Sequence, residues 1–581
     1  METTSGGGAK AALLALMVFV AAIAVALAGD SSTAGASELE TFASCEELDD
    51  WMQSSQGAAR TLPTTGFAIE DTDEAASASG DDSGGAGAEG STESTSAAAA
   101  PVDGAGVGST NVIVEGIDEL DRVEVLSDGR MLATGERTLH LVDVEGARSL
   151  ASLDVPYGAQ VSYDAERSLI WVAGSDDAGA TVVLRVALEG DGFETEGTWR
   201  SAGWLLTGRR TGGGFHVVLT EGFSGPVPFE GGPVPCDDVL HPAGPAAPEA
   251  TLIATLPSEG ALEPAQATEI VGAGQHVHLT DDAVFVATPL FGAEQATSLH
   301  RFDLATLTHT GSGRVDGYLL NEFALSAHEG HLRVGVTVGG GRMGIPMPIE
   351  PGIGDSSSAA ESDAVAGEAE LSVEQPLNEI VVLDTDGDLD VVGRTARFGL
   401  PDETLHGIRF VGDTAYAVTF LQTDPFYVVD LADPAQPRVV GEVKLPGFSS
   451  YLHPVGDGMV VGFGPDESGE AAAKLFDVSD PTQPAVVSSV ALGDESPVVG
   501  DHHAYLQLEG DRFAVPATTW EPITPVDCDP AVTEQRLERA AELERQLQGT
   551  ITEQATDAIY RELDQIWSDP CVSGGGSQPR S

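Results

Sequence analysis

Four side chains in the second half of the chain have the chemistry of transition-metal ligands. They are His453 and the consecutive residues Asp501, His502 and His503. Imidazole together with carboxylate suits zinc or copper, so a metal site built from His453, Asp501 and His502 is one hypothesis. On that hypothesis the protein is a metal-assisted hydrolase or lyase. The alternative is that these histidines make structural hydrogen bonds beside strand ends.

A second set of candidate ligands lies in the acidic stretch Asp384–Asp390, which reads DTDGDLD. Asp384, Asp386 and Asp388 alternate around a glycine, as oxygen ligands do in loops that bind calcium. On this interpretation the loop would hold a structural calcium ion; apart from that, no cofactor is expected. The alternative is a β-hairpin whose turn uses Gly387, and no bidentate glutamate follows at the usual spacing.

A third cluster consists of Asp118, Glu119 and Asp121. These carboxylates could bind a cation, or they could accept hydrogen bonds from turn amides where a sheet begins. The sequence contains no G-x-S-x-G, H-E-x-x-H, Walker or C-x-x-C motif, so no residue is assigned a catalytic role.

The stretch from Glu403 to Gly464 shows which elements must position these side chains. Its apolar, β-branched and aromatic runs are separated by Pro and Gly turns. The pattern predicts five strands, at Ala415–Phe420, Phe426–Leu431, Val439–Leu445, Tyr451–Val455 and Met459–Phe463.

Part of this stretch is repeated. Tyr427–Gly447 recurs 47 residues later as Lys474–Asp494, with Asp430 matched by Asp477 and the paired prolines in the same places. Weaker copies occur upstream, centred on Asp143, Ala187, Thr255, Asp303 and Asp384. A repeat of this length with four short strands is typical of a β-propeller. We therefore expect an all-β propeller of about seven, or eight, four-stranded blades over residues 109–525. Two of the intervals between consecutive copies are longer than the others, and they predict inserted loops near 221–249 and 342–376.

Other segments are expected on either side of the propeller. Residues 1–28 contain an unbroken apolar run with an A-x-A-like site at its end, which indicates a secretory signal or, alternatively, a membrane anchor. Residues 29–60 include a short amphipathic helix at Glu38–Gln53, with Phe42, Cys45, Leu48 and Met52 at helical spacing. Residues 61–108 read as a disordered acidic Ala/Gly/Ser linker.

After the propeller the pattern becomes helical. Residues 526–572 are expected to form a helical hairpin broken near Gly549, and residues 573–581 a disordered tail. The inward face would contain Leu537, Ala541, Leu547, Ile551, Ala555, Ile559, Leu563 and Ile566. Cys528 and Cys571 bracket this hairpin, so we expect them to form a disulfide, leaving Cys45 to pair with Cys236; free thiols are the alternative.

The formal net charge is −65, from 92 acidic and 27 basic residues, and only three of the basic residues are lysine. No basic stripe exists to neutralise phosphates, which excludes a nucleic-acid partner. The acidic excess favours adaptation to high salt, where ions screen self-repulsion. The alternative is that the carboxylates bind divalent cations.

Several of these motifs resemble those of a known family. They are the residues from Ser109 to Asp121, IRFVGDTAYAVTF, TDPFYVVDLADPAQPRVVGE, PGFSSYLHP, LFDVSDPTQP and DHHAYL, which together cover residues 109–519. They resemble secreted bacterial and archaeal proteins with a C-terminal β-propeller domain distantly related to WD-40 repeats. The resemblance implies an exported propeller with no established activity. Family members usually add a further blade where this chain becomes helical. Since the ring must be closed without that blade, we expect Asn111–Gly116 to supply a strand to the last blade.

These observations favour a monomeric binding module, secreted or at the cell surface, whose ligand is an extracellular protein or glycan. Membrane contact would occur only through the N-terminal apolar segment. Propellers host many functions on one frame, so the ligand does not follow from the fold.

Overall fold

The protein is described from a computed structural model. It describes residues 39–51, 113–114, 116–222, 234–242, 249–290, 295–339, 376–420, 424–445, 447–456, 458–507, 512–522, 530–547, 559, 562–563, 566 and 577–580. The apolar run, the acidic linker, nearly all of the 342–376 insert and the expected Cys528–Cys571 disulfide lie outside these residues. Within them, no helix is both long and apolar enough to cross a membrane.

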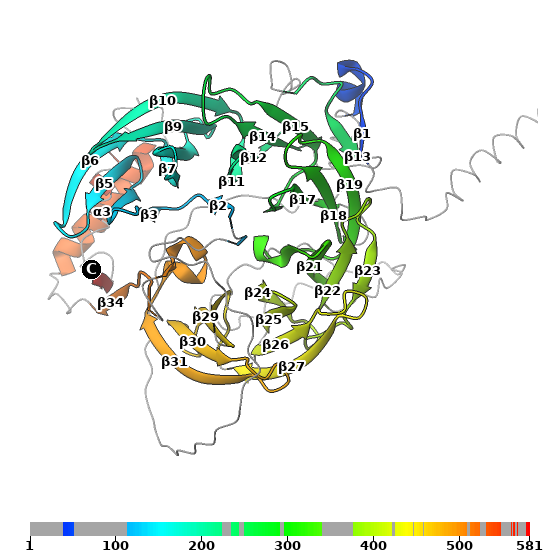
Figure 1. Ribbon diagram of the computed structural model, residues 1–581. Helices are drawn as coiled ribbons and strands as arrows, with labels where there is room; N and C mark the ends of the chain where they lie inside the picture. The colour runs from blue at the N-terminus through cyan, green and yellow to red at the C-terminus, as the bar shows by residue number, and fades with distance from the viewer. Residues whose placement is uncertain are drawn as a thin grey trace, which may run out of the picture.

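Seven antiparallel four-stranded units follow one another around a central axis, as Figure 1 shows. The first three units are β3 (Val123–Val125), β4 (Arg130–Thr134), β5 (Thr138–Asp143) and β6 (Arg148–Asp154); β7 (Tyr157–Asp164), β8 (Leu169–Ser175), β9 (Thr181–Glu189) and β10 (Gly192–Ser201); and β11 (Trp204–Thr211), β12 (Gly214–Gly222), β14 (Glu249–Leu256) and β15 (Gln266–Val271).

The remaining four units are β16 (His276–Leu279), β17 (Ala283–Leu290), β18 (Ala296–Asp303) and β19 (His309–Asp316); β20 (Leu325–His328), β21 (His331–Val338), β22 (Leu377–Asp384) and β23 (Val391–Arg394); β24 (Thr404–Val411), β25 (Thr414–Phe420), β26 (Asp424–Asp430) and β27 (Arg438–Leu445); and β28 (Tyr451–Gly456), β29 (Met459–Pro465), β30 (Ala471–Asp477) and β31 (Ala485–Gly493). These are blades 1 to 7, and they confirm the predicted propeller.

The blades pack face to face through apolar side chains of their middle strands. One buried cluster joins blades 1 and 2, another blades 2 and 3, and a third blades 3 and 4. The largest runs from blade 4 to blade 7 and continues into the segment beyond it, where Val498 and Tyr505 are buried. All five strands predicted in 403–464 are present, because continuous runs of apolar, β-branched and aromatic residues favour strands and the Pro or Gly turns between them set their ends.

The turn between the third and fourth strands of a blade packs on the outer strand of the preceding blade. In blade 6 that outer strand has a β-bulge beside Gly441, and a Cβ atom there would lie 2.1 Å from the Pro481 carbonyl oxygen of blade 7. Gly393 of blade 5 meets Pro434 of blade 6 in the same way, at 2.3 Å. The paired prolines of the repeat therefore belong to the contact between blades.

The stretch that leads into blade 1 does not add a strand to the last blade, so that expectation was wrong for its described residues. Ile113, Val114 and Gly116 lie outside any strand. The following strand β2 (Asp118–Glu119) pairs with β11 of blade 3, on the side that faces the axis. Asp121 then forms a bridge with Val161 of blade 2. We call residues 113–121 the lead segment; it crosses the inner edges of two blades.

A short N-terminal segment covers the outer edge of blade 3. Strand β1 (Leu39–Thr41) pairs with β13 (Leu240–Pro242), which pairs with β15. Residues 45–51 are helical, so the expected helix starts later than predicted. Strand β13 lies within the predicted 221–249 insert, which therefore is not all loop. Cys45 and Cys236 form the expected disulfide, with Cα atoms 5.1 Å apart.

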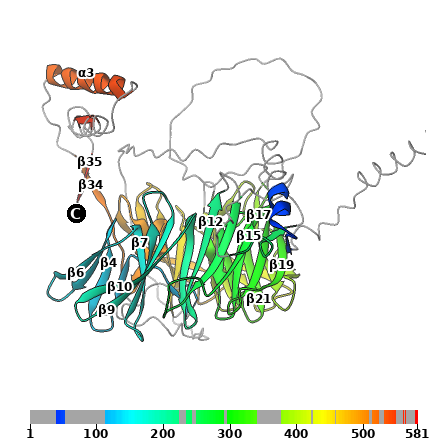
Figure 2. The same ribbon diagram turned by 90° about the horizontal axis from the view of Figure 1, so that it is seen from above.

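Beyond blade 7 the chain forms short elements and one long helix. The 3₁₀ turns η2 (Pro497–Val499) and η3 (His502–Ala504) precede β32 (Leu506–Gln507) and β33 (Phe513–Ala514), which pair with each other. A third 3₁₀ turn, η1 (Glu322–Ala324), lies before β20. Helix α3 (Pro530–Leu547) stands apart from the disc of blades in Figure 2.

Two expectations for this end of the chain need correction. Strand β35 (Ser577–Arg580) pairs with β34 (Thr519–Pro522), so residues 577–580 are not a disordered tail. The buried side of α3 consists of Ala540 and Leu543, which pack on Ile559 and Leu563, whereas Leu537 and Ala541 are exposed. The predicted packing of two helical segments is present, but the inward face of α3 is rotated from the predicted one.

Candidate functional site

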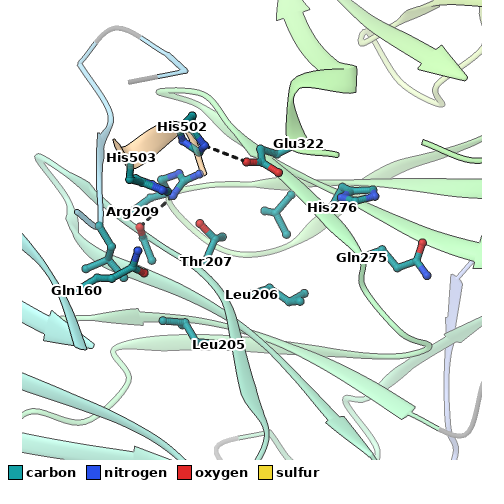
Figure 3. A pocket seen from close by; sticks show the side chains of 13 residues that line it. Gln160, Leu205, Leu206, Thr207, Arg209, Gln275, His276, Glu322, His502 and His503 are labelled. Atoms are coloured by element: carbon teal, nitrogen blue, oxygen red, sulfur yellow. Dashed lines mark hydrogen bonds and ion pairs between the residues drawn. The ribbon is translucent and has the colours of Figure 1, made fainter. Parts of the chain in front are cut away.

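A cavity of about 140 Å³ opens in the central channel, and it is lined by side chains from several blades. Gln160 comes from β7, Arg209 from β11, His276 from β16 and Glu322 from η1, while His502 and His503 come from η3 beyond blade 7. Figure 3 shows these side chains around the opening. The first strand of each blade is the one nearest the axis, so short stretches of distant sequence meet here.

The lead segment places Glu119 in the channel wall. Its side chain is 1 % exposed, and its Oε1 accepts a hydrogen bond from the Ile113 amide at 2.9 Å. Its Oε2 lies 3.4 Å from Arg209 Nη2, 3.2 Å from His502 Nε2 and 3.7 Å from His503 Nε2. Burial alone would raise the pKa of this carboxyl, but Arg209 and the two imidazoles outweigh it and hold the pKa well below its usual range.

The two histidines are oriented by further carboxylates. His502 Nδ1 lies 3.4 Å from Glu322 Oε1, and His503 Nδ1 lies 2.8 Å from Asp501 Oδ1. Asp501 also accepts from the His503 amide and so caps η3. Burial alone would lower the pKa of His503, but Asp501 and Glu119 raise it to about 10; the same contact with His503 lowers the pKa of Asp501 to about 2.

His453 does not join this group. It lies on β28, its Nδ1 is 2.9 Å from the Tyr451 hydroxyl, and its ring stacks on Tyr505 with centroids 4.0 Å apart. Burial, with Arg409 nearby, lowers its pKa to about 3. His453 is therefore a neutral packed side chain, which matches the structural alternative for this residue.

Asp384, Asp386 and Asp388 lie in the hairpin turn between β22 and β23. Asp384 Oδ1 accepts from the Asp386 amide at 2.9 Å, and Gly387 has φ +100°. Asp386 and Asp388 point their carboxylates into solvent, and in the described part of the chain the three side chains do not converge on a common point. The backbone of this turn packs on Gly311 of blade 4, as the proline turns do on later blades. The turn thus serves blade packing.

The acidic residues beside Glu119 lie against the inner strands of blades 2 and 3. Asp118 forms an ion pair with Arg210 at 3.1 Å and a hydrogen bond with Ser162. Glu124 accepts from the Tyr163 amide, and burial together with Asp118 and Asp121 raises its pKa to about 9. The meeting of the lead segment with η3 was not foreseen. Its only sequence signal is that acidic residues stand at one end of the propeller and histidines at the other.

Comparisons with known proteins agree with this architecture. Residues 228–569, more than half of the chain, match the family model described as a beta propeller domain. The family match begins at residue 228, whereas the motifs that resemble the family begin at residue 109. The match extends through helix α3.

Two archaeal relatives cover a smaller part of the chain. An uncharacterized protein of Methanocaldococcus jannaschii is 38% identical over 209 residues, which are 36% of this chain and 28% of that protein. An uncharacterized protein of Archaeoglobus fulgidus is 37% identical over 213 residues, with the same two coverages. The aligned region thus spans little more than a quarter of the length of these curated relatives.

Among solved structures, the crystal structure of Kluyvelomyces marxianus Hsv2 aligns over 64% of this chain and 99% of that one, with a TM-score of 0.35 and 9% identity. Kluyveromyces lactis Hsv2p aligns over 64% and 98%, with the same score and identity. On the extent of the family match, the chain belongs to the beta propeller domain family.

Proposed function

We propose that this protein is an exported binding module that takes the terminal sugar of an extracellular glycan into the cavity of its central channel. The observation that carries the proposal is the lining of that cavity. Gln160, Gln275, Glu322 and Arg209, which carry amide, carboxylate and guanidinium groups, line this one cavity. Such groups are the donors and acceptors that hydroxyl-rich ligands require.

Apolar side chains complete the cavity. Leu205, Leu206 and Val277 lie between the polar groups, so a ligand would contact both kinds of surface. A sugar ring has an apolar face and a polar rim, which fits this mixture. A volume of about 140 Å³ admits a single small ring and excludes a folded protein loop. The end of a glycan therefore fits this cavity better than a protein does.

Two further observations support export. The apolar run at residues 11–28 has the composition of a secretory signal or anchor. The disulfide between Cys45 and Cys236 fits an oxidising compartment, since such bonds rarely persist in the cytosol.

A glycan array probed with the purified chain tests the proposal, followed by calorimetry on the best ligand. Gln160→Ala and Gln275→Ala should each weaken binding at least tenfold, because each removes an amide from the cavity. The matched control is Gln436→Ala, in an exposed turn where Gln436 donates to Asp433, and it should bind like the unmodified protein. Absence of any glycan ligand, or binding that survives both channel variants, would overturn the proposal.

A further inference from the structure

We propose that Glu119, His502 and His503 form a binding site for one divalent transition-metal ion, of the zinc class, in the channel wall. The Nε2 atoms of His502 and His503 lie 3.2 Å and 3.7 Å from the same Glu119 oxygen. In a tetrahedral site with bonds of about 2.0–2.1 Å, ligand atoms stand roughly 3.3 Å apart. Two of the three separations are thus close to the tetrahedral value, and all three ligand atoms lie within 4.8 Å of one another.

The orientation of the two imidazoles matches this role. Each turns its Nε2 toward Glu119 and its Nδ1 toward another carboxylate, Glu322 for His502 and Asp501 for His503. A carboxylate behind a histidine fixes the tautomer and the direction of the ring, and it raises the basicity of the nitrogen that binds metal. Both imidazoles thus have the carboxylate support found behind metal-binding histidines, and both direct Nε2 at the same buried carboxylate.

The site is rigid and also reachable. Glu119 and His502 have side chains that are 1 % and 6 % exposed, and His502 packs edge-on against Phe323 with centroids 4.8 Å apart. Yet both histidines line the channel cavity, so a fourth coordination position would face that space. Three protein ligands with one open position are the arrangement of zinc sites that bind an exchangeable molecule.

The types of the ligands decide which metal is expected. Imidazole nitrogen suits zinc, copper, iron and nickel, whereas calcium and magnesium prefer oxygen ligands alone. The competing arrangement uses no metal. Arg209 and protonated imidazoles then balance the charge of Glu119, and the cluster holds the lead segment to η3 as an ion-pair network. Metal binding would release protons from the imidazoles, so the two arrangements exclude each other.

The experiment uses the full chain without a histidine tag, stripped with a chelator and then titrated with Zn²⁺ and Co²⁺. We expect one ion per chain by elemental analysis, and a Co²⁺ visible spectrum typical of four or five ligands. His502→Gln and His503→Gln should each weaken Zn²⁺ binding about 100-fold. The matched control is His328→Gln, in the exposed group formed with Glu329 and Asp413, and it should retain full binding.

Each outcome decides the proposal. Substoichiometric metal, or unchanged Zn²⁺ affinity in both channel variants, would show that the cluster is an ion-pair network and overturn the metal site. If either variant fails to fold, X-ray absorption of the Zn²⁺-loaded unmodified protein gives the answer, since it counts imidazole ligands directly. Two imidazoles support the site, and any other number refutes it. The proposal does not depend on glycan binding, which is measured separately.

Discussion

At the residue scale, the propeller keeps several histidines neutral by burying them. Burial lowers the pKa of His216, His278 and His406 to about 4, and that of His300 and His453 to about 3. His300 is 2 % exposed and lies between two hydroxyls, with Nδ1 2.8 Å from Ser312 Oγ. A hydroxyl satisfies a neutral imidazole but does not stabilise an added charge.

This burial predicts a loss of stability in acid. Below about pH 6.5 the unfolded chain binds a proton at each of these histidines, whereas folded His300 stays neutral down to about pH 3. The stability present above pH 6.5 is therefore lost as the pH falls toward the folded pKa. His300→Asn should reduce the slope of unfolding free energy against pH by roughly 1.4 kcal/mol per unit between pH 6 and 4. Urea denaturation at several pH values measures this slope. An unchanged slope in His300→Asn would contradict the claim that folded His300 stays neutral.

The residues of the channel cluster show what a sequence can reveal at this scale. Asp501 and His502 were singled out because of their types, and Glu119 because of its acidic neighbours. Their meeting could not be foreseen, since His502 and Glu119 are 383 positions apart and approach only because the lead segment follows the inner edge of blade 3. His453 was chosen on the same grounds as His502, yet Tyr505 stacks over it. Side-chain type indicates possible ligands, and only the path of the backbone decides which of them converge.

At the scale of elements, the contacts between consecutive blades from blade 4 to blade 7 depend on a glycine beside the bulge of each outer strand that is covered. Gly311, Gly393 and Gly441 occupy this place in blades 4, 5 and 6. Each faces the backbone of the turn between the third and fourth strands of the following blade. The contact leaves no room for a methyl group, so it sets how closely consecutive blades approach.

Gly441→Ala should lower the unfolding free energy by about 1–3 kcal/mol, because its Cβ would overlap the Pro481 carbonyl oxygen. The control is Gly212→Ala, since a Cβ on Gly212 would meet nothing within 4 Å. Chemical denaturation of both variants measures the difference. Equal stability of the two would mean that the blades can separate slightly without cost.

The strands that were predicted and those that were missed differ in how they are stabilised. The five strands of 403–464 contain their own runs of apolar, β-branched and aromatic residues, which favour a strand and which the fold buries. Strands β1, β13 and β35 have three or four residues with the sequences LET, LHP and SQPR, which have little intrinsic preference for a strand. They pair only because another edge is present, so local sequence contains no signal for them.

At the scale of the whole molecule, the net charge is the feature that we expect to affect stability most. A net charge of −65 repels itself most strongly when the chain is compact. Raising the NaCl concentration from 0.1 to 1 M shortens the screening length from about 10 Å to about 3 Å. We therefore expect the melting temperature to rise steeply over this range, as calorimetry can show.

The same measurement separates screening from ion binding. At equal ionic strength, MgCl₂ and NaCl should raise the melting temperature by similar amounts if screening is responsible. A much larger effect of MgCl₂ would favour the alternative, in which the carboxylates bind divalent cations. A melting temperature that does not change with NaCl would argue against adaptation to high salt.

The repeat specified the overall architecture well, because each blade packs mainly on its neighbours and a sevenfold pattern in sequence becomes a ring in space. It contained no information about the place between blades 7 and 1. There the chain departs from the repeat, and Figure 1 shows the short elements after β31 in that place. The departure from the repeat is also where the histidines of the channel cluster arise.

The disulfide has a mechanical consequence. Cys45 is bonded to Cys236, 191 residues further along, and β1 is paired to the outer edge of blade 3. A pulling force applied upstream of residue 39 would therefore enter the ring at blade 3 and not at blade 1, where the repeats begin. Residues 46 to 235 lie within the loop closed by this bond and would carry none of the load until it is reduced. A molecule held by its N-terminal end would then be attached at one side of its ring, through this disulfide and the pairing of β1 with β13.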